Sequence, residues 1–570
     1  MTATKTILDH VYDHEAAQPE RVFLTQPVGG GQVVDISWGQ ALDEARRIAA
    51  HLKESGLQPG DMVAMLAKNS AHFILAELAI WMAGGTTVAI FPTETAENVR
   101  YVLQHCAAKL LFIGKLDDWA TQQAAVPAGL PCITLPLPLP LAPAGAAAHL
   151  AHGDSWAAIV ARTAPMPGRP ARTADELAML LYTSGSTGQP KGVMQTFGAV
   201  TAATQGIVDY GLEQDGGVLV AHRVLSYLPL AHCFERAWVE CPALLSGRGH
   251  LYFTDTLATF MDDLKRARPT VFVSVPRLYT KFQQGVLARM PAAQLDAMLD
   301  NPATAGPVGK QVLASLGLDA VVRAGTGSAP MPPALMRWYS RLGLALYDGY
   351  AMTEDFAYSH SSTAQAHAPG RVGRPNPGVQ ARLADDGEIL VKSPGQMQGY
   401  YQEPELTAES FTADGFFKTG DLGLYDEQGL LQLTGRKKEL FKTAKGKYVA
   451  PAPIEGRLSA HPMIELALVA GSGQAAAHAL VMLDENLRPR LTDPALRAQV
   501  ESELGALLDQ VNSAVASHEH LQFIVVAREP WTMANGCLTP TMKIRRSRIE
   551  GSVAEAVAAW YDAPGPVVWA

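Results

Sequence analysis

The chain has 570 residues, of which 48% are apolar and 18% charged, and its formal net charge is −9. This length exceeds what one hydrophobic core usually holds, so the sequence predicts at least two domains, one of them large. Nucleic acid is not an expected partner, because nucleic-acid binding normally requires a strongly basic surface.

The five cysteines include no C-x-x-C pair. This spacing argues against a disulfide framework and a structural zinc site, and it suits a reducing compartment. Asp9, His10 and Asp13 stand where a signal peptide would need an apolar core. No stretch approaches the roughly 18 consecutive apolar residues of a membrane span. We therefore expect a cytoplasmic protein, and the sequence leaves peripheral membrane contact and a homodimer open.

From residue 37 onward, helical and strand patterns alternate along the chain. Ser37 and Gln40 form a capping box before a helix expected up to Gly56. Further helices are expected at 70–85 and 97–109, and strands at 61–67, 86–92, 110–114, 175–183, 270–276 and 319–325. This alternation predicts an α/β fold with mainly parallel strands and helices on the faces of the sheets.

Residues 131–153 read "PCITLPLPLPLAPAGAAAHLAHG". Because alternating proline sustains neither a helix nor an interior strand, we expect a surface excursion of extended character. Its composition is typical of an insertion loop, and a proline segment that docks a partner is the alternative.

After Asp421 the sequence changes to short, polar, turn-rich pieces. A strand is expected at Leu431–Leu433, followed by an exposed charged connector, "GRKK". We place a domain boundary there, which divides the chain into residues 1–435 and 436–570.

A loop rich in glycine and hydroxyl groups, "SGSTGQPKG", directly follows the apolar strand that ends at Thr183. Ligands bind at the carboxyl ends of parallel strands in open α/β sheets. Glycine permits close backbone approach, while hydroxyls and a lysine supply donors and positive charge for phosphate. The candidate phosphate-binding residues are Thr183, Ser184, Gly185, Ser186, Thr187, Gly188 and Lys191.

"YTSGSTGQPKGV" resembles the signature loop of the adenylate-forming enzymes, which include acyl-CoA synthetases, luciferases and peptide-synthetase adenylation domains. Six further blocks follow in the order typical of that superfamily: "YLPLAHCFER", "GTGSAPM", "YDGYAMTE", "FFKTGDLG", "LTGRKKELFKTAKGKYVAP" and "LTPTMKIRR". On these motifs the chain is identified as a member. The resemblance implies a large N-terminal adenylation domain of several subdomains and a small, mobile α+β C-terminal domain.

The resemblance also implies a reaction in two steps, with ATP, Mg²⁺ and CoA. A carboxylate first attacks the α-phosphate of ATP, which gives an acyl-adenylate and pyrophosphate; a thiol then displaces AMP. Because two anions must meet in the first step, the site needs positive charge and fixed donors. Lys543 of "PTMKIRR" matches the lysine that bridges the carboxylate and the α-phosphate.

The remaining site residues follow from the same motifs. The resemblance places Tyr350 against the adenine, Thr353 at the α-phosphate, and Glu354 with Thr183 on Mg²⁺; Ala351 stands where the family usually has glycine. It also implies that Asp421 and Arg436 bind the ribose, that Lys438 is the hinge, and that Lys442 and Gly446 serve nucleotide or CoA after the small domain rotates. Nucleotide contacts are further expected from Gly327, Ser328, Ala329, Asp348 and Gly349.

"LPLAHCFER" is similar to the long-chain fatty acyl-CoA synthetase branch, and His232 within it is a candidate contact for the acid's carboxylate. The chain continues for only a short stretch beyond Lys543, so free CoA is the expected acceptor. The alternatives are a ligase for aryl or medium-chain acids, an acyl-AMP ligase that loads a carrier protein, and a catalytically silent regulator that binds nucleotide and acyl groups.

Overall fold

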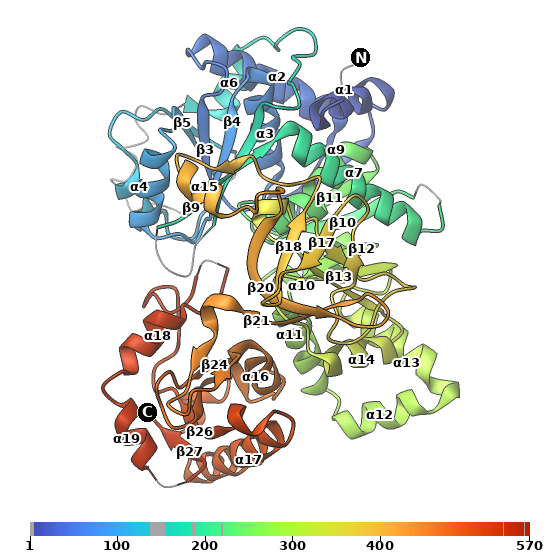
Figure 1. Ribbon diagram of the computed structural model, residues 1–570. Helices are drawn as coiled ribbons and strands as arrows, with labels where there is room; N and C mark the ends of the chain where they lie inside the picture. The colour runs from blue at the N-terminus through green and yellow to red at the C-terminus, as the bar shows by residue number, and fades with distance from the viewer. Residues whose placement is uncertain (1–4, 137–153, 184–188, 218–219, 540, 564) are drawn as a thin grey trace.

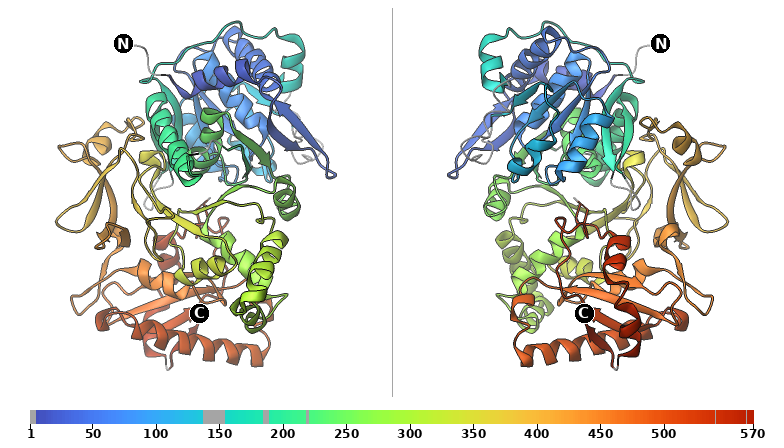
Figure 2. Two further views of the ribbon diagram at one scale, coloured as in Figure 1. Left: turned by 90° about the vertical axis from the view of Figure 1, so that its right-hand side faces the viewer. Right: turned by 90° about the vertical axis from the view of Figure 1, so that its left-hand side faces the viewer.

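The computed structural model describes residues 5–136, 154–183, 189–217, 220–539, 541–563 and 565–570. Figure 1 shows two bodies: the elements up to β21 form the larger one, and the elements from α16 onward gather at one end, beside α11. Figure 2 shows the same division from two further sides, with the orange and red C-terminal elements always together.

The central sheet of the larger body has eight strands in the order β19-β9-β8-β4-β3-β5-β6-β7. Its strands are β3 (Met62–Leu66), β4 (Thr86–Ile90), β5 (Leu110–Ile113), β6 (Cys132–Thr134), β7 (Asp154–Ser155), β8 (Leu177–Thr183), β9 (Lys191–Thr196) and β19 (Gly399–Tyr400). Strands β3 to β8 are parallel, β9 runs antiparallel to β8, and β19 runs antiparallel to β9. The predicted α/β fold with mainly parallel strands is confirmed.

Two further sheets complete the core. One has the order β10-β11-β1-β2 and the other β12-β13-β14-β15-β16. Their strands are β1 (Val22–Pro27), β2 (Val33–Ser37), β10 (His222–Ser226), β11 (Gly249–Phe253), β12 (Val271–Ser274), β13 (Arg323–Thr326), β14 (Leu346–Tyr350), β15 (His360–Ser361) and β16 (Arg374–Pro375). β12, β13 and β14 run parallel, so their carboxyl ends meet at one edge.

The helices pack on these sheets and between them. They are α1 (Ile7–Ala17), α2 (Trp38–Glu54), α3 (Ala71–Ala83), α4 (Ala96–His105), α5 (Trp119–Gln122), α6 (Trp156–Arg162), α7 (Phe197–Gln214), α8 (Cys233–Glu235), α9 (Cys241–Ser246), α10 (Phe260–Ala267), α11 (Pro276–Leu287), α12 (Ala292–Asp300), α13 (Pro302–Ser315), α14 (Pro333–Arg341) and α15 (Pro404–Glu409). The predicted capping box starts α2: Ser37 Oγ accepts from the Gln40 N–H, and Gln40 Oε1 from the Ser37 N–H. Helix α3 is buried along its length except at His72, and it ends at Gly84, whose φ of +93° suits glycine.

The proline-rich segment begins differently from the expectation. Residues Cys132–Thr134 form β6, which pairs with β5 on one side and β7 on the other. Cys132 and Ile133 are buried. Expecting a surface excursion from residue 131 was therefore wrong for these residues, because the Leu-Pro alternation starts only at Leu135 and leaves the apolar "CIT" free to pair. Residues 137–153 lie outside the described residues.

A four-stranded antiparallel sheet, β17-β18-β20-β21, connects the two bodies. It consists of β17 (Gln380–Leu383), β18 (Glu388–Lys392), β20 (Phe417–Tyr425) and β21 (Leu431–Arg436). The exposed 3-10 turn η5 (Lys437–Glu439) follows directly, which confirms the predicted strand and charged connector. The domain boundary after residue 435 stays a prediction.

The C-terminal body is built on the sheet β24-β25-β26-β27. Its elements are β22 (Phe441–Lys442), β23 (Tyr448–Val449), α16 (Pro451–Leu458), β24 (Ile464–Ala470), β25 (Ala477–Leu483), α17 (Pro494–Ser513), β26 (Leu521–Val526), α18 (Arg546–Val553), α19 (Val557–Asp562) and β27 (Val567–Trp569). Its two apolar clusters contain only residues from this body, one on each face of the sheet. It therefore has a core of its own.

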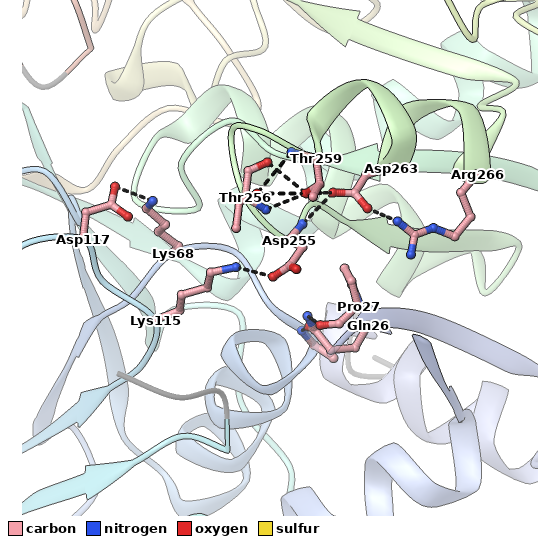
Figure 3. A network of polar contacts seen from close by, with 11 residues as sticks. Gln26, Pro27, Lys68, Lys115, Asp117, Asp255, Thr256, Thr259, Asp263 and Arg266 are labelled. Carbon is pink, nitrogen blue, oxygen red and sulfur yellow. Dashed lines mark hydrogen bonds and ion pairs between the residues drawn. The ribbon is translucent and has the colours of Figure 1, made fainter. Parts of the chain in front are cut away.

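A chain of charged contacts joins the central sheet to the neighbouring sheet (Figure 3). Lys68, after β3, pairs with Asp117, and Lys115 Nζ, after β5, lies 2.8 Å from Asp255 Oδ1, after β11. The Asp255 N–H donates to Asp263 Oδ2 at the start of α10, at 2.8 Å. These contacts tie together the segments that follow three strands.

Within the described part of the chain, none of the helices is both long enough and apolar enough to cross a membrane.

Candidate functional site

A cavity of about 1410 Å³ lies where the two bodies meet. It brings together most of the residues that the motifs singled out. Its lining includes Thr183, His232, Gly327, Ser328, Ala329, Asp348, Gly349, Tyr350, Thr353, Glu354, Asp421, Arg436 and Lys543. Thr183 and Lys543, which are 360 positions apart in the sequence, thus contribute to one space.

The glycine-rich loop joins β8 to β9 in a hairpin. Its two ends are paired, with Thr183 opposite Lys191. Ser184, Gly185, Ser186, Thr187 and Gly188 lie outside the described residues. The loop leaves the carboxyl end of β8, which runs parallel to β4, as predicted. The antiparallel return through β9 had no counterpart in the sequence analysis.

Two residues that the motifs did not indicate hold the Thr353–Glu354 pair. The Tyr400 hydroxyl donates to Glu354 Oε1 at 2.7 Å, and Gln195 Nε2 donates to the Thr353 carbonyl at 3.0 Å. Lys191 Nζ lies 5.4 Å from the centroid of the Tyr400 ring, within range of a cation–π contact. The loop lysine is therefore linked to Glu354 through Tyr400, although Lys191 itself is not among the described residues that line the cavity.

The turn that carries Thr353 and Glu354 has a constrained backbone. It is the 3-10 turn η4 (Thr353–Asp355), followed by Phe356 and Ala357 with φ of +53° and +54°. Such angles are costly for residues with side chains and persist only where the surroundings enforce them. By contrast, Ala351 has no positive φ, so a side chain is tolerated where the family usually has glycine.

Asp421 and Arg436 face each other across β20 and β21. Asp421 Oδ1 accepts from Arg436 Nε at 2.7 Å, and Asp421 Oδ2 accepts from the Tyr350 hydroxyl at 2.8 Å. The predicted adenine and ribose residues thus form one bonded group. Because each carboxylate oxygen has two lone pairs, both oxygens can still accept a ribose hydroxyl.

Lys543 reaches the cavity from a tight turn in the C-terminal body. The Thr539 N–H donates to the Lys543 carbonyl at 2.8 Å, and the Lys543 N–H donates to Thr539 Oγ1 at 3.0 Å. Met542, just before it, has φ of +62°. Lys543 remains exposed toward the cavity. Desolvation by the surrounding protein and then the charge of Arg436 nevertheless lower its pKa, while Asp421 and Glu354 act in the opposite direction.

His232 precedes α8 and lines the cavity. Its Nδ1 accepts from the Phe234 N–H at 3.1 Å, which leaves the ring proton on Nε2. Burial, with a smaller contribution from Lys543, lowers the pKa of His232 to about 3. The ring is therefore neutral at physiological pH, and its Nε2–H can donate to an anion. Next to it, the Thr353 hydroxyl donates to Cys233 Sγ at 3.4 Å and connects the two segments.

The expected hinge and CoA residues lie elsewhere. Lys438 is exposed in η5, and Lys442 and Gly446 belong to the β22–β23 hairpin, where Gly446 has φ of +78°. Lys442 Nζ lies 5.6 Å from the centroid of the Tyr448 ring. None of the three is among the described residues that line the cavity.

Part of the cavity lining is apolar. This apolar part comes from α7, β10, β12 and the π-helix η3 (Arg236–Glu240). These residues are Ile207, Val208, Val224, Val239, Val271 and Val273. A chain of methylene groups would be desolvated favourably in such a space.

The chain matches the family model described as AMP-binding enzyme over residues 11–401, and the AMP-binding enzyme C-terminal domain over residues 439–564. It is 32% identical to the long-chain-fatty-acid–CoA ligase FadD15 of Mycobacterium bovis, over 97% of this chain and 96% of that protein. It is 27% identical to the peroxisomal long chain acyl-CoA synthetase 7 of Arabidopsis thaliana, over 93% and 82%.

Solved structures share the fold. The adenylation domain of a carboxylic acid reductase from Segniliparus rugosus, in complex with AMP and a co-purified carboxylic acid, superposes with a TM-score of 0.80 at 23% identity, covering 98% of this chain and 94% of that one. The anthranilate CoA ligase AuaEII in complex with anthranoyl-AMP gives 0.77 at 20% identity, covering 98% and 99%. With both family models matched in order along the chain, this protein belongs to the AMP-binding enzyme family, and the resemblance read from its motifs is confirmed.

Proposed function

We propose that this protein is an AMP-forming acid–thiol ligase that activates a long-chain fatty acid with ATP and transfers the acyl group to CoA. The observation that carries the proposal is the meeting of Lys543 with His232, Glu354 and Asp421 in one cavity whose lining is partly apolar. Relatives whose names describe long-chain ligases or synthetases match most of both chains, and they support a long-chain fatty acid as the proposed substrate.

In the first step a carboxylate oxygen attacks the α-phosphorus, the new oxygen–phosphorus bond forms, and the bond to pyrophosphate breaks. Lys543 would neutralise the charge that develops between the two anions, and Thr353 would donate to the α-phosphate. The Nε2–H of His232 would orient the acid, while Asp421 and Arg436 hold the ribose beside Tyr350. Nucleotide contacts from Gly327, Ser328, Ala329, Asp348 and Gly349, and phosphate contacts from residues 184–188 and Lys191, complete the proposed site.

Glu354 and Thr183 fit the requirements of Mg²⁺. Both line the cavity, and Tyr400 bonds to Oε1 of Glu354, so that Oε2 can face a cation. One carboxylate and one hydroxyl suit an ion that takes few protein oxygens and completes its shell with phosphate and water. When bound, the ion would offset the negative charge of the triphosphate.

In the second step the CoA sulfur attacks the acyl carbonyl, AMP leaves, and the thiol proton is released. Lys543 has no part in this chemistry. We propose that the C-terminal part, residues 436–570, turns about Lys438, withdraws Lys543 and brings Lys442 and Gly446 to the cavity. A cytoplasmic location, peripheral membrane contact and a homodimer stay predictions.

Pyrophosphate release measured with palmitate, octanoate, benzoate and no acid, each with and without CoA, tests the proposal. We expect the highest kcat/KM with palmitate, and palmitoyl-CoA as the product. A preference for benzoate or octanoate would assign an aryl or medium-chain ligase. Acyl transfer to a carrier protein but not to CoA would indicate an acyl-AMP ligase that loads a carrier protein. If no acid leads to pyrophosphate release, the protein would be a catalytically silent regulator that binds nucleotide and acyl groups.

A further inference from the structure

The segment from Ser226, the last residue of β10, to His232 is held by side chains that do not line the cavity. Three buried residues provide these contacts: Asn69 after β3, Glu235 at the end of α8, and Arg236 at the start of η3. Asn69 is 7% exposed, and Glu235 and Arg236 are both 0% exposed.

Asn69 binds the backbone of the segment at two places. Its Nδ2 donates to the Leu228 carbonyl at 2.7 Å, and its Oδ1 accepts from the Leu230 N–H at 3.1 Å. The side-chain amide thereby fixes the backbone on both sides of Pro229. Its neighbour Lys68 is paired with Asp117 (Figure 3), which anchors the stretch that carries Asn69.

Glu235 and Arg236 also form hydrogen bonds to this segment. Glu235 Oε1 accepts from the Ser226 hydroxyl at 2.6 Å and from the Tyr227 N–H at 3.1 Å. Arg236 Nε donates to the Leu230 carbonyl at 2.6 Å. The backbone groups of Tyr227, Leu228 and Leu230 are thus all bonded to buried side chains.

Arg236 is itself immobilised by two buried acids. Its Nη1 lies 2.5 Å from Glu77 Oε1 on α3 and 3.2 Å from Glu240 Oε2, one turn further along η3. η3 is a π-helix, a rare form that is frequent at functional sites. Burying charged groups costs free energy that only close pairing can offset. Here the pairs connect α3 to the segment before His232.

We propose that Asn69, Glu235 and Arg236 are positioning residues that hold His232 where its Nε2–H meets the carboxylate of the acid. The inference rests on the proposed function, since it concerns the geometry of acid activation. Glu235 needs only an oxygen acceptor for this task, because both of its bonds to the segment end on Oε1. Burial raises the pKa of Glu235 to about 8, which agrees with a neutral acid in that role.

A double-mutant cycle on pyrophosphate release tests the inference. Asn69→Ala should lower kcat/KM for the acid about tenfold to a hundredfold, because small misplacements of a reacting partner are costly, and should leave KM for ATP unchanged. In a His232→Ala background the same change should have almost no effect, since nothing remains to be positioned. Equal losses in both backgrounds would overturn the inference.

Conservative variants keep the test independent of stability. Glu235→Gln retains the acceptor oxygen and should stay within about threefold of wild type, whereas Glu235→Leu should resemble Asn69→Ala. Ser226→Ala, a milder change, should give a small loss that also disappears with His232→Ala. If Glu235→Gln is as damaging as Glu235→Leu, the positioning role of Glu235 is wrong.

Asn512 offers a matched control in the C-terminal body. It holds one residue by both backbone groups, with Nδ2 donating to the Leu521 carbonyl at 2.9 Å and Oδ1 accepting from the Leu521 N–H at 2.8 Å. Asn512→Ala should lower Tm without changing KM for the acid. A wild type that releases no pyrophosphate would contradict the proposed function; an active wild type with an additive cycle would contradict the positioning role alone.

Discussion

The two halves of the cavity are built in different ways. The half from the larger body places Thr353, Glu354 and His232 on segments fixed by partly buried hydrogen bonds and a buried ion pair. The half from the C-terminal body places Lys543 on a turn that is open to the cavity. The first arrangement suits groups that must be preorganised, and the second suits the withdrawal of Lys543 that we propose between the two steps.

The contacts between the bodies agree with this difference. Glu465 of β24 pairs with Arg277 of α11 and, within its own body, with Arg488 Nη2 at 3.2 Å. Lys281 of α11 lies 3.1 Å from Glu485. Partly exposed ion pairs contribute about 0–1 kcal/mol each, so they can hold one orientation without trapping it.

The largest expected effect comes from removing Lys543. Lys543→Ala should lower the rate of adenylation by about a hundredfold to a thousandfold, since one preorganised charge at the reacting atoms contributes roughly 3–4 kcal/mol. Thioester formation from supplied acyl-adenylate should remain, because the second step as we propose it does not use Lys543. Single-turnover assays of each half-reaction measure the two rates. Lys310→Ala, which changes an exposed lysine of α13, is the control. An equal loss of rate in both half-reactions upon Lys543→Ala would contradict the assignment of Lys543 to adenylation alone.

Asp421 tests whether the fixed half also binds the nucleotide. Asp421→Ala removes the acceptor of both Tyr350 and Arg436. It should raise KM for ATP about tenfold to a hundredfold, as expected for hydrogen bonds to a charged group worth roughly 1.5–3 kcal/mol. KM for the acid should change little. Asp414→Asn, in the turn before β20 and outside the described lining of the cavity, should leave both constants unchanged.

His360 tests how the larger body responds to acid. It is 1% exposed, and burial lowers its pKa to about 3. In the unfolded chain His360 is protonated below about pH 6.5, whereas in the folded chain it stays neutral until the pH approaches 3. The neutral, buried ring therefore costs no stability above pH 6.5, and the free energy of unfolding decreases as the pH falls from there toward 3. Between pH 7 and pH 5 the loss is about 2 kcal/mol.

His360→Gln should reduce the difference in unfolding free energy between pH 7 and pH 5 by that amount, measured by urea unfolding at both values. The exposed His518→Gln should not change the difference. A wild-type dependence on pH that persists in His360→Gln would show that other groups are responsible.

The smallest effect is expected at the contact between the bodies. Lys281→Glu should slow adenylation about threefold at low salt, because repulsion from Glu485 disfavours the orientation that brings Lys543 to the cavity. Adding Glu485→Lys should restore the rate by exchanging the two charges. At about 1 M salt the difference should vanish, since such charges are then screened. A loss that salt does not relieve would point to packing rather than charge.

Local patterns predicted much of the fold. The capping box at Ser37, the buried helix α3 and the strands β3, β4, β5 and β8 all follow from periodicity and end signals within a few residues. The start of the proline-rich segment was misread because three apolar residues carry little periodicity of their own. Their pairing with β5 depends on a strand that lies about 20 residues earlier.

The site shows the same limit more clearly. Tyr400 is 46 positions from Glu354, Gln195 is 158 from Thr353, and Asn69 is 161 from Leu230. Nothing near a lone tyrosine, glutamine or asparagine indicates its partner. The pairing of β19 with β9 brings Tyr400 near Lys191, and this contact cannot be read from the sequence around Tyr400.

By itself, the sequence determined the family, because its motifs follow one another in a fixed order without reference to geometry, and on those motifs it predicted the glycine-rich loop, Glu354, Asp421 and Lys543 as the groups of acid activation. The tertiary structure decided how each group is held. It buries the acids and the arginine around residues 226–232, neutralises His232 by desolvation, and leaves Lys543 on an open turn. Burial and long-range hydrogen bonds arise only when distant segments pack together, and they distinguish the half of the cavity around His232 and Glu354 from the half that carries Lys543.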